Sequence, residues 1–285
     1  GGDRPQQVTV SDYYIAETEV TQALWKAVMG ISIQDEYEEY KKQCEGMNIH
    51  LRMHGEGDEY PMYYLSWNEC QEFITKLNQL TGKQFRLPTE AEWEFAARGG
   101  NRSNGYKYAG SNTLGDVAWY KDNCSNTTHP VQQKMDNELG LYDMSGNVSE
   151  WCLDWYGTYS SSAQTNPIGL TSGTFRVRRG GSIHSVEGGC RVSNRLNATP
   201  TDSDSDAGFR LAIGEAVKME IVLPSITTTK ITQIAETTAV AGGHVTSDGN
   251  GTVSERGVVY STSPGPTISN LSNTICPCGS GTGEF

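Results

Sequence analysis

Residues 85–100 read Phe85-Arg-Leu-Pro-Thr-Glu-Ala-Glu-Trp-Glu-Phe-Ala-Ala-Arg-Gly-Gly100. The stretch predicts a short helix that begins after Thr89, because a threonine followed three residues later by a glutamate, here Glu92, forms a capping box. The pair Gly99-Gly100 predicts the end of this helix, since glycine readily adopts the left-handed conformation that terminates helices. The sequence therefore places one well-bounded helix directly after a proline.

Two further helices are predicted earlier in the chain, over residues 21–30 and 68–80, and each is ended by a glycine. Residues 31–59 are acidic and polar, so we expect a surface insertion there. Residues 101–209 carry few helix signals and predict mostly loops, turns and short strands. The first part of the chain thus combines few helices with much irregular structure.

The composition changes near residue 214. All six tryptophans lie at or before Trp155, whereas the chain beyond residue 213 is rich in β-branched residues and turn pairs such as Asn250-Gly251. Such runs are typical of short strands joined by hairpins. We therefore predict two domains, residues 8–214 and 220–285, with a boundary near residues 214–223.

The charge of the chain excludes one class of partner. There are 22 Lys and Arg against 34 Asp and Glu, which gives a formal net charge of -12. An acidic surface does not neutralise phosphates, so nucleic-acid binding is not expected. No apolar stretch approaches the roughly 18 residues that a membrane-spanning helix needs, so no such segment is expected either.

Three more stretches, together with residues 85–100, resemble one protein family. They are Gly140-Leu-Tyr-Asp-Met-Ser-Gly-Asn-Val-Ser-Glu-Trp151, Arg176-Val-Arg-Arg-Gly-Gly-Ser182 and Gly208-Phe-Arg-Leu-Ala212. In this order and spacing they resemble the formylglycine-generating enzymes, or sulfatase-modifying factors, from about Asp12 to Ile213. The resemblance implies an irregular α+β, C-type-lectin-like fold with few helices and much ordered loop. The C-terminal segment resembles the Ig- or fibronectin-III-like repeats of Bacteroidetes surface proteins, and its length predicts a partial all-β module.

The resemblance also implies a test of the enzyme's chemistry. In the family two cysteines, three and eight residues after the serine of the Gly-Gly-Ser motif, hold copper. Counting from Ser182, these positions are Ser185 and Cys190. A hydroxyl is a poor ligand for Cu(I), which prefers thiolates. Bound copper and catalysis through Ser182 and Cys190 are therefore expected only if the protein is a formylglycine-generating enzyme. The replacement of one copper ligand by Ser185 argues against that hypothesis. A weak copper pair of His184 with Cys190 is the remaining variant.

The positions of two cysteines resemble those in a non-enzymatic bacterial branch of the family. That branch carries one cysteine after the Glu-Trp pair and another before an arginine. The matching residues are Cys152 and Cys190. We expect them to be neighbours that a disulfide can join; the alternative is two separate buried thiols. The chain has seven cysteines in total, so at least one lacks a partner within the chain.

A calcium site is also implied by the resemblance, since family members hold the ion with backbone carbonyls and a glutamate near the Gly-Asn-x-x-Glu-Trp stretch. The matching residues are Ser145, Gly146, Asn147, Val148 and Glu150. Oxygen ligands in a tight turn suit Ca²⁺. Alternatively, Glu150 simply accepts backbone N–H bonds.

Residues 183–207 match the family poorly although they lie between two well-matched motifs. We expect them to form an exposed contact surface. Its candidate ligand-binding residues are Ile183, His184, Ser185, Val186, Leu196, Ala198, Asp202, Asp204 and Asp206. Their residue types are compatible with diversification by a retroelement that randomises asparagine codons, and equally with ordinary drift in a solvent loop.

The main hypothesis is therefore a ligand-binding protein that is secreted or lies at the cell surface, whether extracellular, periplasmic or on the outer membrane. Its partner would be a protein or a glycan, because loops held by a rigid scaffold are common binding sites. Two alternatives stay open: a formylglycine-generating oxidase that acts on a sulfatase cysteine, and a structural surface lipoprotein.

Overall fold

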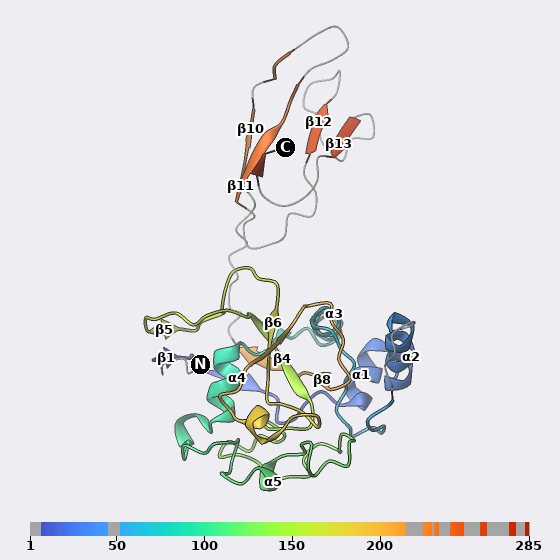
Figure 1. Cartoon of the computed structure of the whole chain (residues 1–285), viewed down its shortest axis with the longest axis vertical. Coiled ribbons are helices and arrows are strands. Elements are labelled where there is room, and N and C mark those ends of the chain that lie inside the picture. Colours follow the sequence, from blue (N-terminus) through green and yellow to red (C-terminus); the bar gives the residue numbers. More distant parts are fainter. Residues whose placement is uncertain are drawn as a thin grey trace. The chain divides into compact units, whose positions relative to one another are not determined.

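The structure is a computed structural model that describes residues 7–44, 52–214, 225–229, 231–233, 240–247, 257–260, 274–277 and 283–284. The chain divides into two compact units, Gly1–Val217 and Lys218–Phe285, both shown in Figure 1. Among the described residues, no helix is long and apolar enough to cross a lipid bilayer.

Two helices of the first unit confirm their predicted ends. Helix α1 (Gln22–Met29) begins after Thr21 and ends at Gly30, whose φ of 80° lies in the left-handed region. Helix α4 (Glu90–Ala97) begins with the predicted capping box at Thr89. Because these ends depend on side chains only three residues apart, the local sequence determines them.

Helix α3 (Trp67–Thr81) begins one residue earlier than the sequence predicted. Its cap is Ser66, which forms a capping box with Glu69, and Gly82 ends it in the left-handed conformation. The apolar face of α3 is buried against α1, and the ring of Phe73 stacks on Trp25 with centroids 5.2 Å apart.

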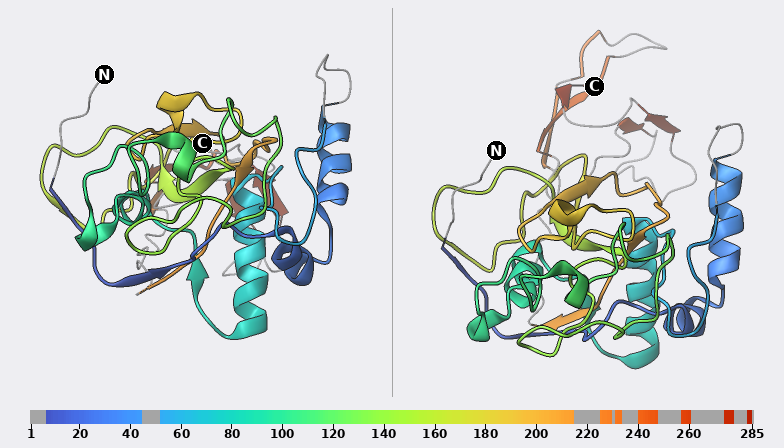
Figure 2. Two further views of the ribbon diagram at one scale, coloured as in Figure 1. Left: turned by 90° about the horizontal axis from the view of Figure 1, so that it is seen from below. Right: turned by 60° about the horizontal axis from the view of Figure 1, so that its bottom comes forward.

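The predicted surface insertion is partly wrong, because residues 33–43 form helix α2 (Ile33–Gln43). Ile33 is only 3% exposed and belongs to the main hydrophobic core. The ring of Tyr40 lies 4.8 Å from that of Tyr64, centroid to centroid. Helix α2 is thus acidic on its outer side and docked on the core by its inner side, and it lies at the periphery of the unit in Figure 2.

A four-stranded sheet with the order β7-β6-β4-β8 forms the centre of the first unit. Its strands are β4 (Ser149–Trp155), β6 (Arg176–Arg179), β7 (Leu196–Ala198) and β8 (Ala207–Gly208). Strand β4 pairs antiparallel with β6 and parallel with β8. Helix α4 and the group α1–α3 flank this sheet from different sides (Figures 1 and 2).

Two smaller sheets join distant parts of the unit. Strand β9 (Ala212–Gly214) lies between β2 (Tyr13–Ile15) and β3 (Phe85–Arg86) and pairs antiparallel with both. Strand β1 (Val8–Thr9) pairs parallel with β5 (Gln164–Thr165). The beginning and the end of the unit are therefore held in one sheet.

The stretch between α4 and β8 is mostly loop, as predicted. Its helical turns are short: η1 (Gly100–Arg102), α5 (Leu114–Val117) and η2 (Glu187–Cys190). The loops are ordered around three hydrophobic clusters, the largest of which contains Trp25, Phe73, Trp151 and Phe209, each fully buried. A mixed α and β architecture with few helices and several small sheets results.

The second unit contains short strands. They are β10 (Ser225–Thr228), β11 (Gly243–Ser247), β12 (Gly257–Tyr260), β13 (Thr274–Pro277) and β14 (Gly283–Glu284). Strand β11 pairs antiparallel with β10 and β14, and β12 pairs antiparallel with β13. The turn pair Asn250-Gly251 that helped to predict hairpins lies outside the described residues.

Candidate functional site

The loop after β6 holds the residues that match the family's copper positions. The Ser185 hydroxyl accepts the backbone N–H of Ser182 at 3.0 Å, and the Ser185 N–H donates to the Ser182 carbonyl at 3.0 Å. A Cβ added to Gly181, whose φ is 74°, would lie 2.8 Å from the Gly189 carbonyl oxygen. The loop is therefore a tight turn in which Ser185 has a structural hydrogen bond.

Cys190 is fully buried and does not fit a Cu(I) ligand set. Burial raises the pKa of its thiol to about 12, so it stays protonated at neutral pH. It packs beside Tyr108 and Val117, while the second thiolate that Cu(I) requires is replaced by the Ser185 hydroxyl. In the alternative pair with Cys190, the His184 ring lies against His54 and Asp206.

Cys152 and Cys190 are not joined by a disulfide. Both are free and fully buried, and they belong to two different hydrophobic clusters. The disulfide form of the hypothesis is therefore wrong, and the alternative of two separate buried thiols describes this structure.

The segment 183–207 is less exposed than predicted. Ile183 is 1% exposed and part of the packed interior, so it cannot contact a ligand. Ser185, Leu196 and Ala198 are half-buried, and the last two lie in β7. The exposed predicted residues are His184, Val186 and Asp202, and half of the Asp204 side chain is accessible.

Asp206 has a structural role that its predicted place on an exposed surface did not suggest. It accepts hydrogen bonds from Ser182 Oγ and from Arg178, and its Oδ2 lies 3.4 Å from His184 Nδ1. Burial opposes ionisation, but the hydrogen bond from His184 and the charge of Arg178 lower the pKa of Asp206 to about 2. Asp206 is therefore an anchor that fixes the base of the loop.

One residue beside the predicted segment was missed from the sequence. His54 lies in a loop far from residue 184, yet its ring is 4.8 Å from the His184 ring, with an angle of 80° between the planes. The side chain is nearly buried, and its Nδ1 lies 3.1 Å from the Asn126 carbonyl oxygen. No local pattern marks a pair of histidines separated by 130 positions, so only the fold reveals it.

The residues predicted to hold calcium are gathered at the start of β4, and the side chains of Ser145, Asn147 and Glu150 already have hydrogen-bond partners. The Glu150 carboxylate accepts from the indole N–H of Trp93 at 2.7 Å and from the guanidinium of Arg210 at 2.7 Å. A calcium ion at Glu150 would compete with the buried Arg210 cation. The side-chain geometry thus does not fit the ion, and calcium stays a prediction that depends on backbone carbonyls.

Asn147 is likewise engaged. Its side chain donates to Glu19 Oε2 at 2.8 Å and accepts the backbone N–H of His129 at 3.0 Å. Ser145 Oγ donates to the Cys190 carbonyl at 3.0 Å. Of the predicted calcium residues, these two therefore tie β4 to neighbouring loops.

The middle of the segment 183–207 is fixed by Glu90. Its carboxylate accepts from Arg195 at 2.6 and 2.7 Å, from Arg179 at 2.8 Å and from the Tyr159 hydroxyl at 2.9 Å. Arg179 is fully buried and Glu90 is 4% exposed. Paired and hydrogen-bonded charges of this kind are the form in which ionised groups are tolerated in a protein interior.

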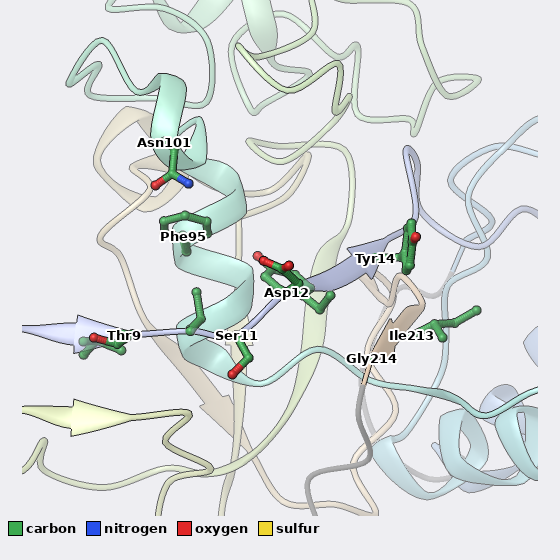
Figure 3. A pocket seen from close by; sticks show the side chains of 11 residues that line it. Thr9, Ser11, Asp12, Tyr14, Phe95, Asn101, Ile213 and Gly214 are labelled. Carbon is green, nitrogen blue, oxygen red and sulfur yellow. The ribbon is translucent and has the colours of Figure 1, made fainter.

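A separate open groove of about 760 Å³ follows the N-terminal strands. Figure 3 shows Phe95 and Asn101 on one side and Tyr14, Ile213 and Gly214 on another. None of the predicted site residues lines it. The groove and the 183–207 loop are therefore different features of the first unit.

The fold and these motifs define an α+β, loop-rich protein built around buried Arg–Glu pairs. Residues 3–214 match the model of the sulfatase-modifying factor enzyme 1-like domain. The chain belongs to this formylglycine-generating-enzyme family. The sequence-based recognition of the family is confirmed.

Several known proteins are similar to this chain. The chaperone protein LppX of Paenibacillus barcinonensis is 34% identical over 244 residues, which cover 72% of this chain and 81% of that protein. The formylglycine-generating enzyme of Thermomonospora curvata is 36% identical over 175 residues, so the chain spans about half of that enzyme's length, 55%. Among solved structures, Treponema denticola variable protein 1 matches with a TM-score of 0.63 and 33% identity, over 74% of this chain and 87% of that one.

Proposed function

We propose that the first unit is a non-enzymatic member of its family that binds a protein or a glycan through the contact surface. This surface consists of the exposed side chains of His184, Val186, Asp202 and Asp204. The observation that carries the proposal concerns the two positions that match the family's copper ligands. One is occupied by Ser185, and the other by Cys190, whose thiol is fully buried. The family resemblance implies that copper is held there by two thiolates, the ligands that Cu(I) prefers.

The construction of the loop supports a binding role. Asp206, Ser182 and Arg178 fix its base through buried hydrogen bonds, and Arg195 fixes the middle through Glu90. The side chains of Val186 and Asp202 lie outside this network, whereas Asp204 and His184 lie at its rim, next to Arg178 and Asp206 respectively. Binding residues are commonly placed on loops that a rigid scaffold positions. A replacement of Val186 or Asp202 would therefore change the surface and leave the frame intact.

The relatives are compatible with this proposal. A protein named as variable has a similar structure over most of its length, and a protein named as a chaperone is similar in sequence over most of its length. We extend the proposal to diversification of residues 183–207 by a retroelement. A reverse-transcriptase gene beside an adenine-mismatched copy of the coding segment would support this extension, and a genome without one would end it.

The proposal includes a C-type-lectin-like arrangement for the first unit and a location outside the cytoplasm, at the envelope or beyond it. It also includes a partial Ig- or fibronectin-III-like module for residues 220–285. Antiparallel pairing of β10 with β11 and of β12 with β13 supports the module. A structural surface lipoprotein remains the second candidate. Recovery of the chain in a stable envelope complex would distinguish it from free ligand binding.

The test is a protein and glycan array probed with the full chain, followed by affinity measurement on any hit. Replacing His184, Val186, Asp202 and Asp204 together by alanine should abolish binding. The matched control replaces the exposed Lys76 and Leu80 of α3 by alanine and should bind normally.

A second assay addresses the oxidase alternative. The chain is incubated with Cu(I) and a Cys-x-Pro-x-Arg peptide, and the peptide mass is followed. We expect no aldehyde product. Turnover in this assay, or binding that survives the fourfold alanine variant, would overturn the proposal.

A further inference from the structure

His54 and His184 meet at the edge of the contact surface. Their ring centroids are 4.8 Å apart, and the rings are nearly perpendicular, at 80°. His54 is 6% exposed, whereas His184 is exposed to solvent. The pair therefore joins a nearly buried imidazole to one that an ion from solution can reach.

The Nδ1 atom of each imidazole lies near an oxygen acceptor. His54 Nδ1 lies 3.1 Å from the Asn126 carbonyl oxygen, and His184 Nδ1 lies 3.4 Å from Asp206 Oδ2. With the proton on Nδ1, each Nε2 carries a lone pair, and within the described part of the chain neither Nε2 has a hydrogen-bond partner. Histidines that bind metals are typically held in this way, with the other ring nitrogen donating to a carbonyl or a carboxylate.

The surrounding charges favour neutral imidazole at His54 and an ionised carboxylate behind His184. Burial lowers the pKa of His54, and the neighbouring His184 ring lowers it further. Asp206 is held ionised by Arg178, whose guanidinium also pairs with Asp204. The Arg52 guanidinium donates to the same Asn126 carbonyl, at 3.2 Å. Neutral imidazole is the form that binds metal ions.

We propose that His54 and His184 bind one divalent transition-metal ion of the Ni²⁺, Cu²⁺ and Zn²⁺ group through their Nε2 atoms. Imidazole suits these ions, and Cu²⁺ binds most tightly among them in the general order of affinities. Within the described residues no group of three or more His, Cys, Asp or Glu side chains forms a metal site. The chain thus supplies two ligands, and water or a group of the bound partner completes the coordination.

The experiment is titration of the tag-free full chain with Cu²⁺, Ni²⁺ and Zn²⁺ at pH 7.5, by calorimetry, with electron paramagnetic resonance of the Cu²⁺ form. We expect one ion per chain and a spectrum with coupling to two imidazole nitrogens. His184→Gln and His54→Gln should each remove one nitrogen from the spectrum. Asp206→Asn should weaken binding by about 10- to 100-fold, because it replaces the charged carboxylate that orients His184 by a neutral amide.

His244→Gln, in the second unit, is the matched control and should bind as the unchanged chain does. Since His184 is exposed, its replacement should leave the melting temperature unchanged, which separates loss of a ligand from loss of the fold. Equal binding by the double variant of His54 and His184, or a spectrum without imidazole coupling, would overturn the proposal. The metal test uses the chain alone, so its result is independent of whether the contact surface binds a protein or a glycan.

Discussion

At the scale of single residues, buried arginine–carboxylate pairs hold the loops of the first unit. Arg210 is fully buried against Glu150, Arg179 against Glu90, and Arg178 against Asp206. Removing one partner of such a pair leaves an uncompensated charge in the interior. These residues from the family motifs therefore stabilise the fold, and none of them belongs to the contact surface.

Glu90 provides the sharpest test of this role, because it accepts from two arginines and a tyrosine. We predict that Glu90→Ala lowers the free energy of unfolding by about 3–5 kcal/mol, as expected when a buried ion pair loses one partner. Urea denaturation measures the change. Glu38→Ala, in an exposed pair with Lys41 on α2, is the control and should change stability by less than about 0.5 kcal/mol. Equal effects of the two substitutions would contradict the prediction.

For Glu36 we predict a change in stability of the opposite sign, because removing its charge should stabilise the fold. Burial raises the pKa of this carboxyl to about 7, and the negative charge of Glu69 adds to the effect. Between pH 4.5 and 7 the folded chain keeps a proton that the unfolded chain releases, so the contribution of Glu36 to stability falls as the pH rises through this window. We expect Glu36→Gln to stabilise the protein by on the order of 1–2 kcal/mol at pH 8.

The same substitution should reduce the slope of stability against pH between 4.5 and 7, and it should have little effect at pH 4. Glu39→Gln, on the same helix but exposed, serves as control. Thermal denaturation across this pH range provides the measurement. A slope that is unchanged in Glu36→Gln would show that Glu36 does not carry the excess proton.

The sequence-based predictions failed for residues whose contacts are with residues far away in the sequence. Asp206 was predicted to be exposed because it lies in the segment 183–207, but Arg178 and Ser182 donate to its carboxylate. His54 was not identified at all, since its partner His184 is distant in sequence. The Ser185 and Cys190 positions, in contrast, follow from counting along one motif, and the structure shows the thiol to be buried.

At the scale of elements, helix ends were predictable and helix docking was not. The ends of α1 and α4 depend on caps within three residues, and both predictions are confirmed. Helix α2 was missed although Ser32 and Asp35 form a capping box and the apolar residues Ile33, Tyr37 and Tyr40 recur at helical spacing. Its high content of acidic residues concealed this helix, which also packs against the core through Ile33 and Tyr40.

Helix caps of the same kind should contribute more to the free energy of unfolding where they are buried than where they are exposed. Ser66 begins α3 inside the core, and its hydroxyl and backbone N–H both engage Glu69. We predict that Ser66→Ala costs about 1–2 kcal/mol, the upper part of the range for a lost cap. Ser32→Ala, at the exposed start of α2, should cost no more than about 1 kcal/mol.

Equilibrium unfolding measures both costs, and hydrogen exchange localises them. Faster exchange should appear in α3 for the first variant and be confined to α2 for the second. If Ser32→Ala also loosened α3, the two helices would unfold as one cooperative unit, contrary to this prediction.

At the scale of the whole molecule, the three hydrophobic clusters, two of which contain tryptophans, lie entirely within the first unit. The two ends of this unit also lie in one sheet, because β9 near residue 214 pairs with β2 near residue 13. The mixed α and β class and the family could be predicted from ordered motifs. The contact partners of the loop residues could not, because they are set by tertiary packing of distant segments.

A unit that has its own core and holds its two ends in one sheet should fold by itself. We predict that a fragment of residues 1–217 unfolds cooperatively, with a melting temperature within about 4 °C of that transition in the full chain, which corresponds to roughly 1 kcal/mol for a domain of this size. Differential scanning calorimetry of both proteins provides the comparison. As control, a fragment that ends at residue 210 lacks β9, so β2 and β3 lose their shared partner, and it should be strongly destabilised or unfolded. If the 1–217 fragment melted far lower than the full chain, residues 218–285 would have to stabilise the first unit directly, and the division into two independent units would be wrong.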